Sequence, residues 1–329
     1  MQEKIDILMA TYNGEKYIKE QIDSILTQTY SNFNLFICDD ASNDDTVKIL
    51  KEYEKKDKRI KLILNKINIG AKKNFEKLLK LVKSRYFMFA DQDDVWLENK
   101  IEITFNELKR TNSDLVFTDL CVVDENLNVI NSSFNALKKY KKKIKSCVGS
   151  EDLVFLYNTV TGCTILSKSK WIEEYLSIKC DFKNILHDHI LPLLVCLKGK
   201  VSYIDIPTIL YRQHGNNEVG IKRYTDNLKS FEEVRNHLID VKLNLLNFYS
   251  KNISIFSSDK REIIYDGIKY FNKIKEKNVI NLYGISTYRR LYKKEKITYK
   301  LLYFIIFNIP FIAKFGYFLK NIFKKKKVS

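Results

Sequence analysis

Several signals that would assign this chain to a common class are scarce or missing. Six cysteines occur without any Cys-x-x-Cys pair, and several stand in apolar runs, which favours reduced core thiols over a zinc site or a disulfide framework. No Gly-x-Gly-x-x-Gly motif is present, which disfavours a dinucleotide-dependent dehydrogenase. With only three prolines and ten glycines among 329 residues, long flexible linkers are not expected.

Long apolar segments are also lacking. The run Leu301–Phe307 is well short of the roughly 20 residues that span a bilayer. Residues 1–6 lack the apolar stretch of a signal peptide. We therefore expect a cytoplasmic catalytic part without a membrane-spanning helix.

Acidic residues are nearly absent from the last part of the chain. The net charge is +17, and residues 283–329 hold twelve Lys/Arg against one Glu. A second cluster, residues 138–145, holds six lysines, although a solvated loop explains that run equally well. Such bias indicates an anionic partner, which is a phospholipid, a nucleic acid or a phosphorylated substrate.

Residues 297–329 combine aromatic and aliphatic runs with lysines. A segment of this kind is typical of an amphipathic element that lies in the membrane interface with its lysines on anionic headgroups. We predict a basic tail that holds the chain peripherally at the inner face of the cell membrane. The alternative is a terminal core helix followed by a basic tail.

The first 120 residues alternate short apolar runs with helical patterns. This alternation predicts an α/β fold with a mostly parallel sheet and helices on both faces. The expected helices include residues 15–27 and 44–55, the second capped by Ser42 or Asn43. After residue 224 the pattern becomes wholly helical. We predict a catalytic domain over 1–220, a helical extension over 221–296 and the tail over 297–329.

The loops that follow the first four expected strands are polar. Thr11–Gly14 follows the first, Asp39–Ser42 the second, Asn65–Gly70 the third and Asp91–Asp94 the fourth. In parallel sheets such loops converge on one edge, where ligands bind. Carboxylates without His or Cys pairs suit Mg²⁺ or Mn²⁺, and magnesium usually shares its ligands with substrate phosphates. The pattern therefore predicts a metal-bound nucleoside diphosphate.

Residues 1–220 contain four motif strings in succession, which are ATYNGEKYIKEQIDSILTQTY, ICDDASNDDT, NIGAKKNF and FMFADQDDVWLENK. In their residues and their order these motifs resemble family 2 glycosyltransferases of the GT-A fold. Asp91–Trp96, His187–His189 and Tyr211–Asn217 resemble the rhamnosyltransferase-like branch in particular. The resemblance implies an inverting transfer of a sugar from a nucleotide-sugar donor to a glycan or lipid-linked acceptor in surface polysaccharide synthesis. The branch points to dTDP-rhamnose, with UDP-hexoses next.

The resemblance also implies roles for individual residues. Asp188 is the general base that accepts the proton of the acceptor hydroxyl. Asp93 ligates the metal, and His214 completes the metal site or touches the diphosphate. The implied nucleotide-binding residues are Thr11, Tyr12, Asn13, Asp39, Asn68, Gly70, Asp91 and Arg212, and the implied metal ligands are Asp93, Asp91 and His214.

Alternatives stay open for several of these residues. One of Asp39 and Asp40 is expected to cap the helix that follows, Asp188 is also placed to cap its helix, and His214 also fits an ordinary surface loop. At the level of function, a nucleotidyltransferase also uses acidic strand ends, but it would need a phosphate loop richer in glycine than TYNGEKY. A nucleic-acid-binding protein would spread its charge over a recognition surface, whereas here the charge is concentrated beside an apolar segment, so no nucleic-acid partner is expected.

Overall fold

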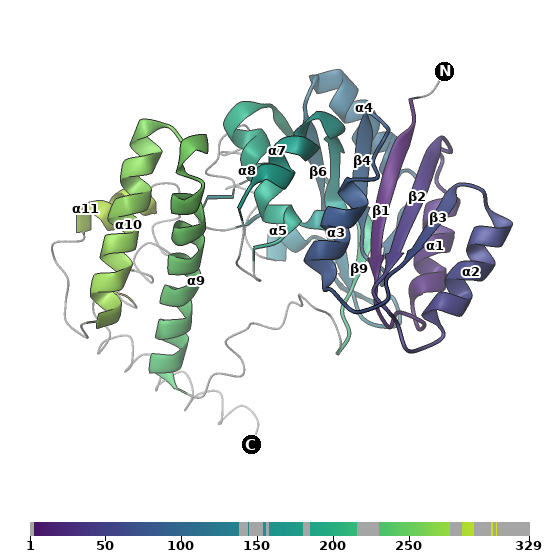
Figure 1. Ribbon diagram of the computed structural model, residues 1–329, viewed down its shortest axis with the longest axis horizontal. Helices are drawn as coiled ribbons and strands as arrows, with labels where there is room; N and C mark the ends of the chain where they lie inside the picture. Colours follow the sequence, from purple (N-terminus) through teal and green to yellow (C-terminus); the bar gives the residue numbers. More distant parts are fainter. Residues whose placement is uncertain are drawn as a thin grey trace. The chain divides into compact units, whose positions relative to one another are not determined.

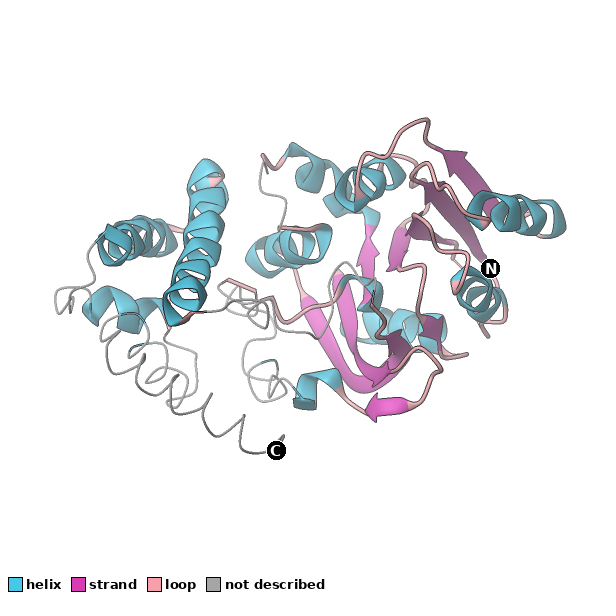
Figure 2. Cartoon of the chain, turned by 90° about the horizontal axis from the view of Figure 1, so that it is seen from below, coloured by secondary structure: helices cyan, strands magenta, loops and turns pink. Residues whose placement is uncertain are grey.

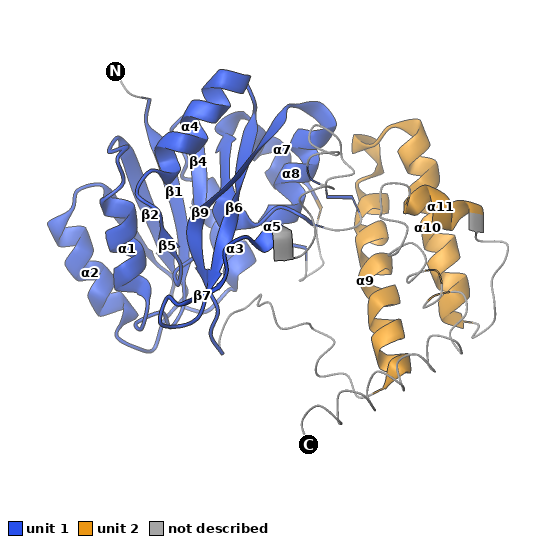
Figure 3. Ribbon diagram, turned by 180° about the vertical axis from the view of Figure 1, so that it is seen from behind, with its two compact units in different colours: residues 1–178, 183–220 blue, residues 179–182, 221–329 orange. Residues whose placement is uncertain are grey.

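The computed structural model describes residues 3–137, 158–179, 185–215, 230–276 and 285–292, together with Ile144, Val154, Phe155, Phe304 and Phe307. The chain divides into two compact units (Figure 3). Unit 1 comprises residues 1–178 and 183–220, and unit 2 comprises residues 179–182 and 221–329.

The first half of unit 1 is a parallel strand-helix alternation, as the sequence predicts (Figure 1). Strand β1 pairs in parallel with β2 on one side and with β4 on the other, and β2 pairs in parallel with β3. Residues 86–90 of β4 are all buried, because helices cover the sheet here. The elements are β1 (Ile5–Thr11), α1 (Ile18–Leu26), β2 (Phe33–Asp39), α2 (Thr46–Lys56), β3 (Ile60–Leu64), α3 (Ala71–Leu79) and β4 (Tyr86–Ala90).

The second half of unit 1 makes the sheet mixed. The strand order is β3-β2-β1-β4-β8-β6-β9-β5, with β7 beside β6. β8 runs antiparallel to both of its neighbours, whereas β6 and β9 are parallel to each other. The elements are β5 (Val95–Trp96), α4 (Lys100–Thr111), β6 (Leu115–Val123), β7 (Val129–Asn131), α5 (Phe134–Leu137), η2 (Gly162–Thr164), β8 (Ile165–Lys168), η3 (Ser169–Trp171), α7 (Ile172–Ser177), α8 (His187–Lys198) and β9 (Val201–Arg212).

The strand order reverses between β1 and β4. From β3 to β1 the sheet grows in one direction, and β4 then adds to the opposite side of β1. Loops on the two sides of such a switch point separate at the carboxyl edge and leave space for a ligand. The loops after β1 and β4 are therefore the natural walls of a site.

Helices α1 and α2 begin later than predicted, because the residues expected in their first turns belong to the loops at the carboxyl edge of the sheet, which we call the edge loops. Helix α1 begins at Ile18, since the Glu15 carboxylate accepts from the Asp45 N–H at 2.8 Å. Helix α2 begins at Thr46, and its N-cap Asp45 makes no side-chain cap hydrogen bond. The prediction of a Ser42 or Asn43 cap is wrong.

Unit 2 is helical in the described residues, with α9 (Phe231–Lys251), η5 (Ile253–Ile255), α10 (Ser258–Glu276) and α11 (Ile285–Leu291) (Figure 2). The Ser230 hydroxyl caps α9 by accepting from the Glu233 N–H at 3.1 Å. A Cβ on Gly267 would lie 2.9 Å from Leu246 Cδ1, so this glycine permits the close approach of α10 and α9.

Two residues of the predicted tail pack inside unit 2. The Phe307 ring is fully buried and meets the Phe271 ring edge-on at 5.4 Å. The Phe304 ring lies 5.5 Å from that of Tyr288. The rest of residues 297–329, and the lysine cluster 138–145 apart from Ile144, lie outside the described residues. Among the helices that the structure describes, none has both the length and the apolar character to cross a membrane.

Candidate active site

Asp39 and Thr11 lie at the ends of neighbouring strands and bond to each other. The Thr11 hydroxyl donates to Asp39 Oδ2 at 3.0 Å, and both residues are almost fully buried. The Ser42 hydroxyl and N–H donate to the same carboxylate at 2.6 and 3.0 Å. Asp39 thus fixes the loop after β2 and caps no helix.

Asp40 holds the next loop. Its carboxylate accepts from the Ile69 N–H at 2.8 Å, the Gly70 N–H at 2.7 Å and Asn65 Nδ2 at 2.9 Å. Burial raises the pKa of this carboxyl, but these hydrogen bonds outweigh burial and leave the pKa below its ordinary value. The expectation that Asp39 or Asp40 caps the helix is therefore wrong, because both carboxylates serve the edge loops.

The loop that Asp40 holds keeps one position open. Gly70 has φ 85°, which disfavours other residues, and a Cβ there would meet no atom within 4 Å. Asn68 is exposed beside it. Nucleotide binding by Asn68 and Gly70 stays a prediction, and the open space beside Gly70 is compatible with it.

The loop after β1 presents Tyr12 and Asn13. Tyr12 is 43% exposed, so its ring is not a packing residue of the core. Asn13 adopts φ 47°, and its side-chain oxygen accepts from the Asn43 N–H at 2.9 Å. The main chain of Tyr12 bonds to the amide of Gln92, in the loop after β4.

Asp93 and His214 meet although 121 positions separate them. His214 Nε2 lies 2.8 Å from Asp93 Oδ2, and both side chains are largely buried. The His214 ring stacks on that of Tyr17, with ring centroids 4.7 Å apart. His214 is therefore held by contacts at the loop after β4, Asp91–Asp94, which we call the acidic loop. It is not an ordinary surface histidine.

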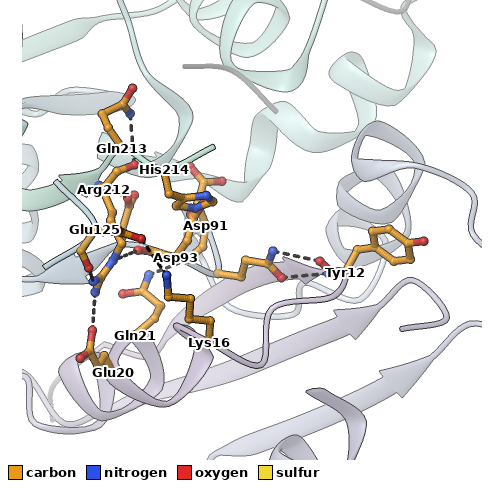
Figure 4. A network of polar contacts seen from close by, with 12 residues as sticks. Tyr12, Lys16, Glu20, Gln21, Asp91, Asp93, Glu125, Arg212, Gln213 and His214 are labelled. Carbon is orange, nitrogen blue, oxygen red and sulfur yellow. Dashed lines mark hydrogen bonds and ion pairs between the residues drawn. The ribbon is translucent and has the colours of Figure 1, made fainter. Parts of the chain in front are cut away.

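Arg212 holds the Asp93–His214 pair in place through contacts with the main chain and with Tyr17. Its guanidinium donates to the carbonyl oxygens of Asp93 at 2.8 Å and Glu125 at 2.7 Å, and also to the carboxylate of Glu20 (Figure 4). The same group lies 4.5 Å from the Tyr17 ring centroid. These contacts give Arg212, which is 2% exposed, a role in holding the acidic loop, and phosphate binding by Arg212 stays a prediction.

Asp94 is the buried member of the acidic loop. Burial raises its pKa well above the ordinary value, and the charges of Asp93 and Asp91 raise it further. It accepts from the Arg212 N–H at 3.1 Å, and the Cys163 thiol also bonds to it. Nearby, the fully buried Lys100 ammonium lies 4.8 Å from the Trp96 ring centroid, and burial lowers its pKa to about 8. Trp96 is 3% exposed and is a packing residue.

Ligand atoms for a cation are present at this loop. One ligand atom each from Asp91, Asp94 and Cys163 lies within 4.8 Å of the others. Burial raises the pKa of the Cys163 thiol well above its ordinary value, so this sulfur stays protonated and is a poor ligand for a hard cation. Asp93 and His214 form a separate pair, so among the described residues the ligand atoms of Asp93, Asp91 and His214 are not grouped this closely, and their service as one cation site stays a prediction. Carboxylate oxygens suit Mg²⁺ or Mn²⁺, and the presence of Asp91, Asp93 and Asp94 in one loop fits a bound divalent cation.

Asp188 lies in the first turn of α8, at the position where the sequence places the helix start. Leu186 is the N-cap, so Asp188 does not cap the helix. Burial raises the pKa of Asp188 to about 7, although a hydrogen bond from the Gly162 backbone opposes this. A carboxyl with a pKa near 7 is suited to general-base catalysis at physiological pH.

The turn η2 connects Asp188 with the acidic loop. The backbone of Gly162 bonds to Asp188, and the thiol of the next residue, Cys163, bonds to Asp94. A Cβ on Gly162 would lie 2.5 Å from His187 Nε2, so only glycine fits here. The His187 ring contacts both Phe75 and Phe89, with ring centroids 4.2 and 4.3 Å away, and burial lowers its pKa to about 3.

Sequence reasoning missed four residues that organise this site. The sequence pattern around these residues indicates their roles only weakly, because the roles depend on contacts across the sheet. Gln92 stands inside the acidic motif, and Tyr17 stands in the first helical pattern, which favoured packing. The four are Gln92, Tyr17, Gly162 and Lys100.

Comparisons with known proteins agree with this geometry. The sequence profile of Glycosyl transferase family 2 matches residues 6–163. The chain is 34% identical over 228 residues to the dTDP-rhamnosyl transferase RfbG of Shigella flexneri, covering 64% of this chain and 73% of that protein. It is 36% identical over 145 residues to the UDP-Glc:alpha-D-GlcNAc-diphosphoundecaprenol beta-1,3-glucosyltransferase WfgD of Escherichia coli, covering 44% of this chain and 56% of that protein.

Solved structures share the fold. S. aureus TarS 1-349 in complex with UDP-GlcNAc superposes with a TM-score of 0.56 at 16% identity, covering 89% of this chain and 82% of that chain. The mannosyltransferase PcManGT from Pyrobaculum calidifontis, in complex with GDP-Man and Mn²⁺, gives a TM-score of 0.52 at 14% identity, covering 82% and 70%. The fold, the edge loops and the similarity to RfbG together show that this chain belongs to glycosyltransferase family 2, with a GT-A fold.

Proposed function

We propose that this chain is an inverting, metal-dependent glycosyltransferase that moves a sugar from a nucleotide diphosphate to a glycan or lipid-linked acceptor. The observation that carries the proposal is η2, where adjacent residues bond to Asp188 and to the acidic loop. A base with a pKa near 7 is thereby tied to the loop that would hold a donor diphosphate. Membership of glycosyltransferase family 2 disfavours the alternatives of a nucleotidyltransferase and a nucleic-acid-binding protein.

Each of the proposed site residues would have its own part in the reaction. Asp188 accepts the proton of the acceptor hydroxyl while that oxygen attacks the anomeric carbon and the bond to the diphosphate breaks. Asp93, Asp91 and His214 would hold Mg²⁺ or Mn²⁺, which supplies positive charge at the leaving diphosphate. Arg212 and Tyr17 keep Asp93 and His214 in place. A single displacement of this kind inverts the anomeric configuration.

We assign nucleotide binding to the loops on the β1–β4 edge. Tyr12 is exposed and suited to stack on a base, while Thr11, Asn13 and Asp39 fix the loops beside it. The remaining proposed nucleotide-binding residues are Asn68, Gly70 and Asp91.

The names of the relatives guide the proposal for donor and acceptor. RfbG is named as a dTDP-rhamnosyl transferase, and WfgD as a UDP-Glc enzyme that acts on a diphosphoundecaprenol-linked sugar. We therefore propose dTDP-rhamnose as the first donor to test, UDP-hexoses as the second, and a polyprenyl-diphosphate-linked glycan as the acceptor. The place of such a reaction is the synthesis of a surface polysaccharide.

A donor panel tests the proposal. The full chain with Mn²⁺ is incubated with dTDP-rhamnose, UDP-glucose and other nucleotide sugars, and release of the nucleoside diphosphate is measured with and without a lipid-linked acceptor. One donor should be turned over and show acceptor-dependent acceleration. Absence of release from every donor, with the acceptor present, would contradict the function.

Membrane binding is the further part of the proposal. Residues 308–329 hold six lysines, and each lysine near an anionic surface contributes about 1 kcal/mol. Because Phe304 and Phe307 pack in unit 2, we place the start of the membrane-binding segment after Phe307. The cytoplasmic leaflet carries the anionic lipids, which favours the inner face.

A truncation after Asn308 is expected to lose this binding. The full chain should sediment with phosphatidylglycerol-containing vesicles, and high salt should release it only in part, because apolar contacts are not screened. The shortened chain keeps Phe304 and Phe307, so its thermal melting should resemble that of the full chain. Vesicles of phosphatidylcholine alone are the control, and equal sedimentation of both chains would show that residues 309–329 do not bind lipid.

A further inference from the structure

Gln92 connects the acidic loop to the loop after β1. It stands between Asp91 and Asp93, and its side-chain amide makes two hydrogen bonds to the main chain of Tyr12. Gln92 Oε1 accepts from the Tyr12 N–H at 2.9 Å, and Nε2 donates to the Tyr12 carbonyl oxygen at 3.0 Å. Two bonds to one residue fix its position and its orientation, which a single bond would not.

This contact spans the switch point of the sheet. β1 and β4 are adjacent and parallel, and Met9 opposite Ala90 is the last pair in register before their loops begin. The loop after β4 carries the proposed metal ligand Asp93, and the loop after β1 carries the proposed base-stacking residue Tyr12. Gln92 therefore joins the two proposed parts of the site at the carboxyl edge of the sheet, where ligands of such folds bind.

The amide of Gln92 is confined as well as bonded. A Cβ on Gly14 would overlap Gln92 Oε1 and lie 2.8 Å from its Cδ, so the amide packs directly on the glycine backbone. The Gly14 N–H donates to the Thr46 hydroxyl at 2.8 Å, which holds the glycine in place. The side chain thus has little freedom to leave Tyr12.

The loop after β1 passes this constraint on to the loop after β2. The Asn13 N–H donates to the Ser42 hydroxyl at 2.9 Å, and that hydroxyl donates to Asp39. A displacement of the Tyr12 main chain therefore reaches Asp39 through two hydrogen bonds.

We infer that Gln92 is a positioning residue that couples cation binding at Asp93 to nucleoside binding at Tyr12 and Asp39. A cation drawn between Asp93 and its neighbours fixes the acidic loop, and the Gln92 amide then fixes the Tyr12 main chain in the same arrangement. The nucleoside meets a loop that is already ordered, so it binds more tightly. The inference rests on the proposed nucleotide and metal sites.

Nucleosides without phosphate isolate this coupling. A diphosphate would touch the cation directly, whereas uridine and thymidine have no group that does so, and any effect of Mg²⁺ on their affinity passes through the protein. The affinity of the full chain for each nucleoside is measured by ligand-observed NMR in Mg²⁺ and in EDTA. For the wild type we expect Mg²⁺ to tighten the better-bound nucleoside by about 5-fold, the lower end of usual couplings between sites.

Two variants remove the link in different ways. Gln92→Met keeps the length of the side chain but loses both hydrogen bonds, and Gly14→Ala displaces the amide while keeping it. In both, the effect of Mg²⁺ should fall to less than about 2-fold, while affinity in EDTA changes little. The matched control is Asn106→Met, an exposed amide on α4, which should keep the wild-type coupling.

Three results would overturn the inference. One is an unchanged Mg²⁺ effect in Gln92→Met and Gly14→Ala, with melting temperatures near that of the wild type. Another is a wild type in which Mg²⁺ strengthens UDP or dTDP binding but leaves nucleoside binding unchanged, since the coupling then runs only through phosphate and the proposed function stands. The third is no binding of UDP or dTDP under any condition, which overturns the proposed function together with the inference.

Discussion

Asp93→Ala should abolish sugar transfer and leave the chain folded. The Asp93 carboxylate lies 2.8 Å from His214 at the edge of the sheet and is the proposed central ligand of the cation. Without it, the charge that develops on the leaving diphosphate is not stabilised, and we expect a loss of at least about 10³-fold, or about 4 kcal/mol of transition-state stabilisation. The fold should survive because Arg212 bonds to the main-chain carbonyl of residue 93, which alanine retains.

Transfer rate and Mn²⁺-induced stabilisation measure this effect. The wild type should show a rise of melting temperature with Mn²⁺ that Asp93→Ala lacks, since a ligand that binds only the folded state stabilises it. Asp45→Ala is the matched control, because its side chain is 67% exposed and makes no cap hydrogen bond. A wild type that is fully active in excess EDTA would refute metal dependence altogether.

Asp188→Asn should lower turnover by at least about 10²-fold, the usual contribution of general-base catalysis. Asparagine keeps the size and polarity of the side chain but accepts no proton. Donor affinity, measured as binding of the nucleoside diphosphate, should change little. An equal loss in donor binding, or a turnover near that of the wild type, would exclude Asp188 as the base.

The raised pKa of Asp188 also predicts how activity depends on pH. The base acts in its deprotonated form, so wild-type kcat/KM should rise with pH up to about 7 and then level. Asp188→Asn should lose this rise. The exposed Asp240→Asn variant in unit 2 is the control and should keep the wild-type profile.

The same pKa has a consequence for stability. The folded pKa of Asp188 is about 7 and its ordinary value is 3.8, so between these values the folded state holds a proton that the unfolded state has lost. Stability therefore falls as pH rises through this window and is lowest above it. At pH 8 Asp188→Asn should unfold at a temperature at least about 2 °C above the wild type, and near pH 4 the two should coincide.

Much of the fold and of the candidate site could be predicted from the local sequence pattern. The alternation of strands and helices in the first half of the chain and the polar loops at the carboxyl edge were predicted because strand-helix alternation is set by residues close in sequence. The start of α8 beside Asp188 was predicted for the same reason. The motif order was enough to identify the family, which the comparisons confirm.

The tertiary structure alone decided which polar groups meet. Asp93 and His214 are 121 positions apart, and Gln92 and Tyr12 are 80 apart, so their pairing depends on strand order and register. The antiparallel direction of β8 and the two-residue strand β5 could not be predicted from the sequence pattern either. A strand this short has too few residues to show the alternation of apolar and polar side chains. Burial raises the pKa of Asp188 to about 7. The degree of burial depends on how the whole chain packs, so it cannot be predicted from the residues next to Asp188 in the sequence.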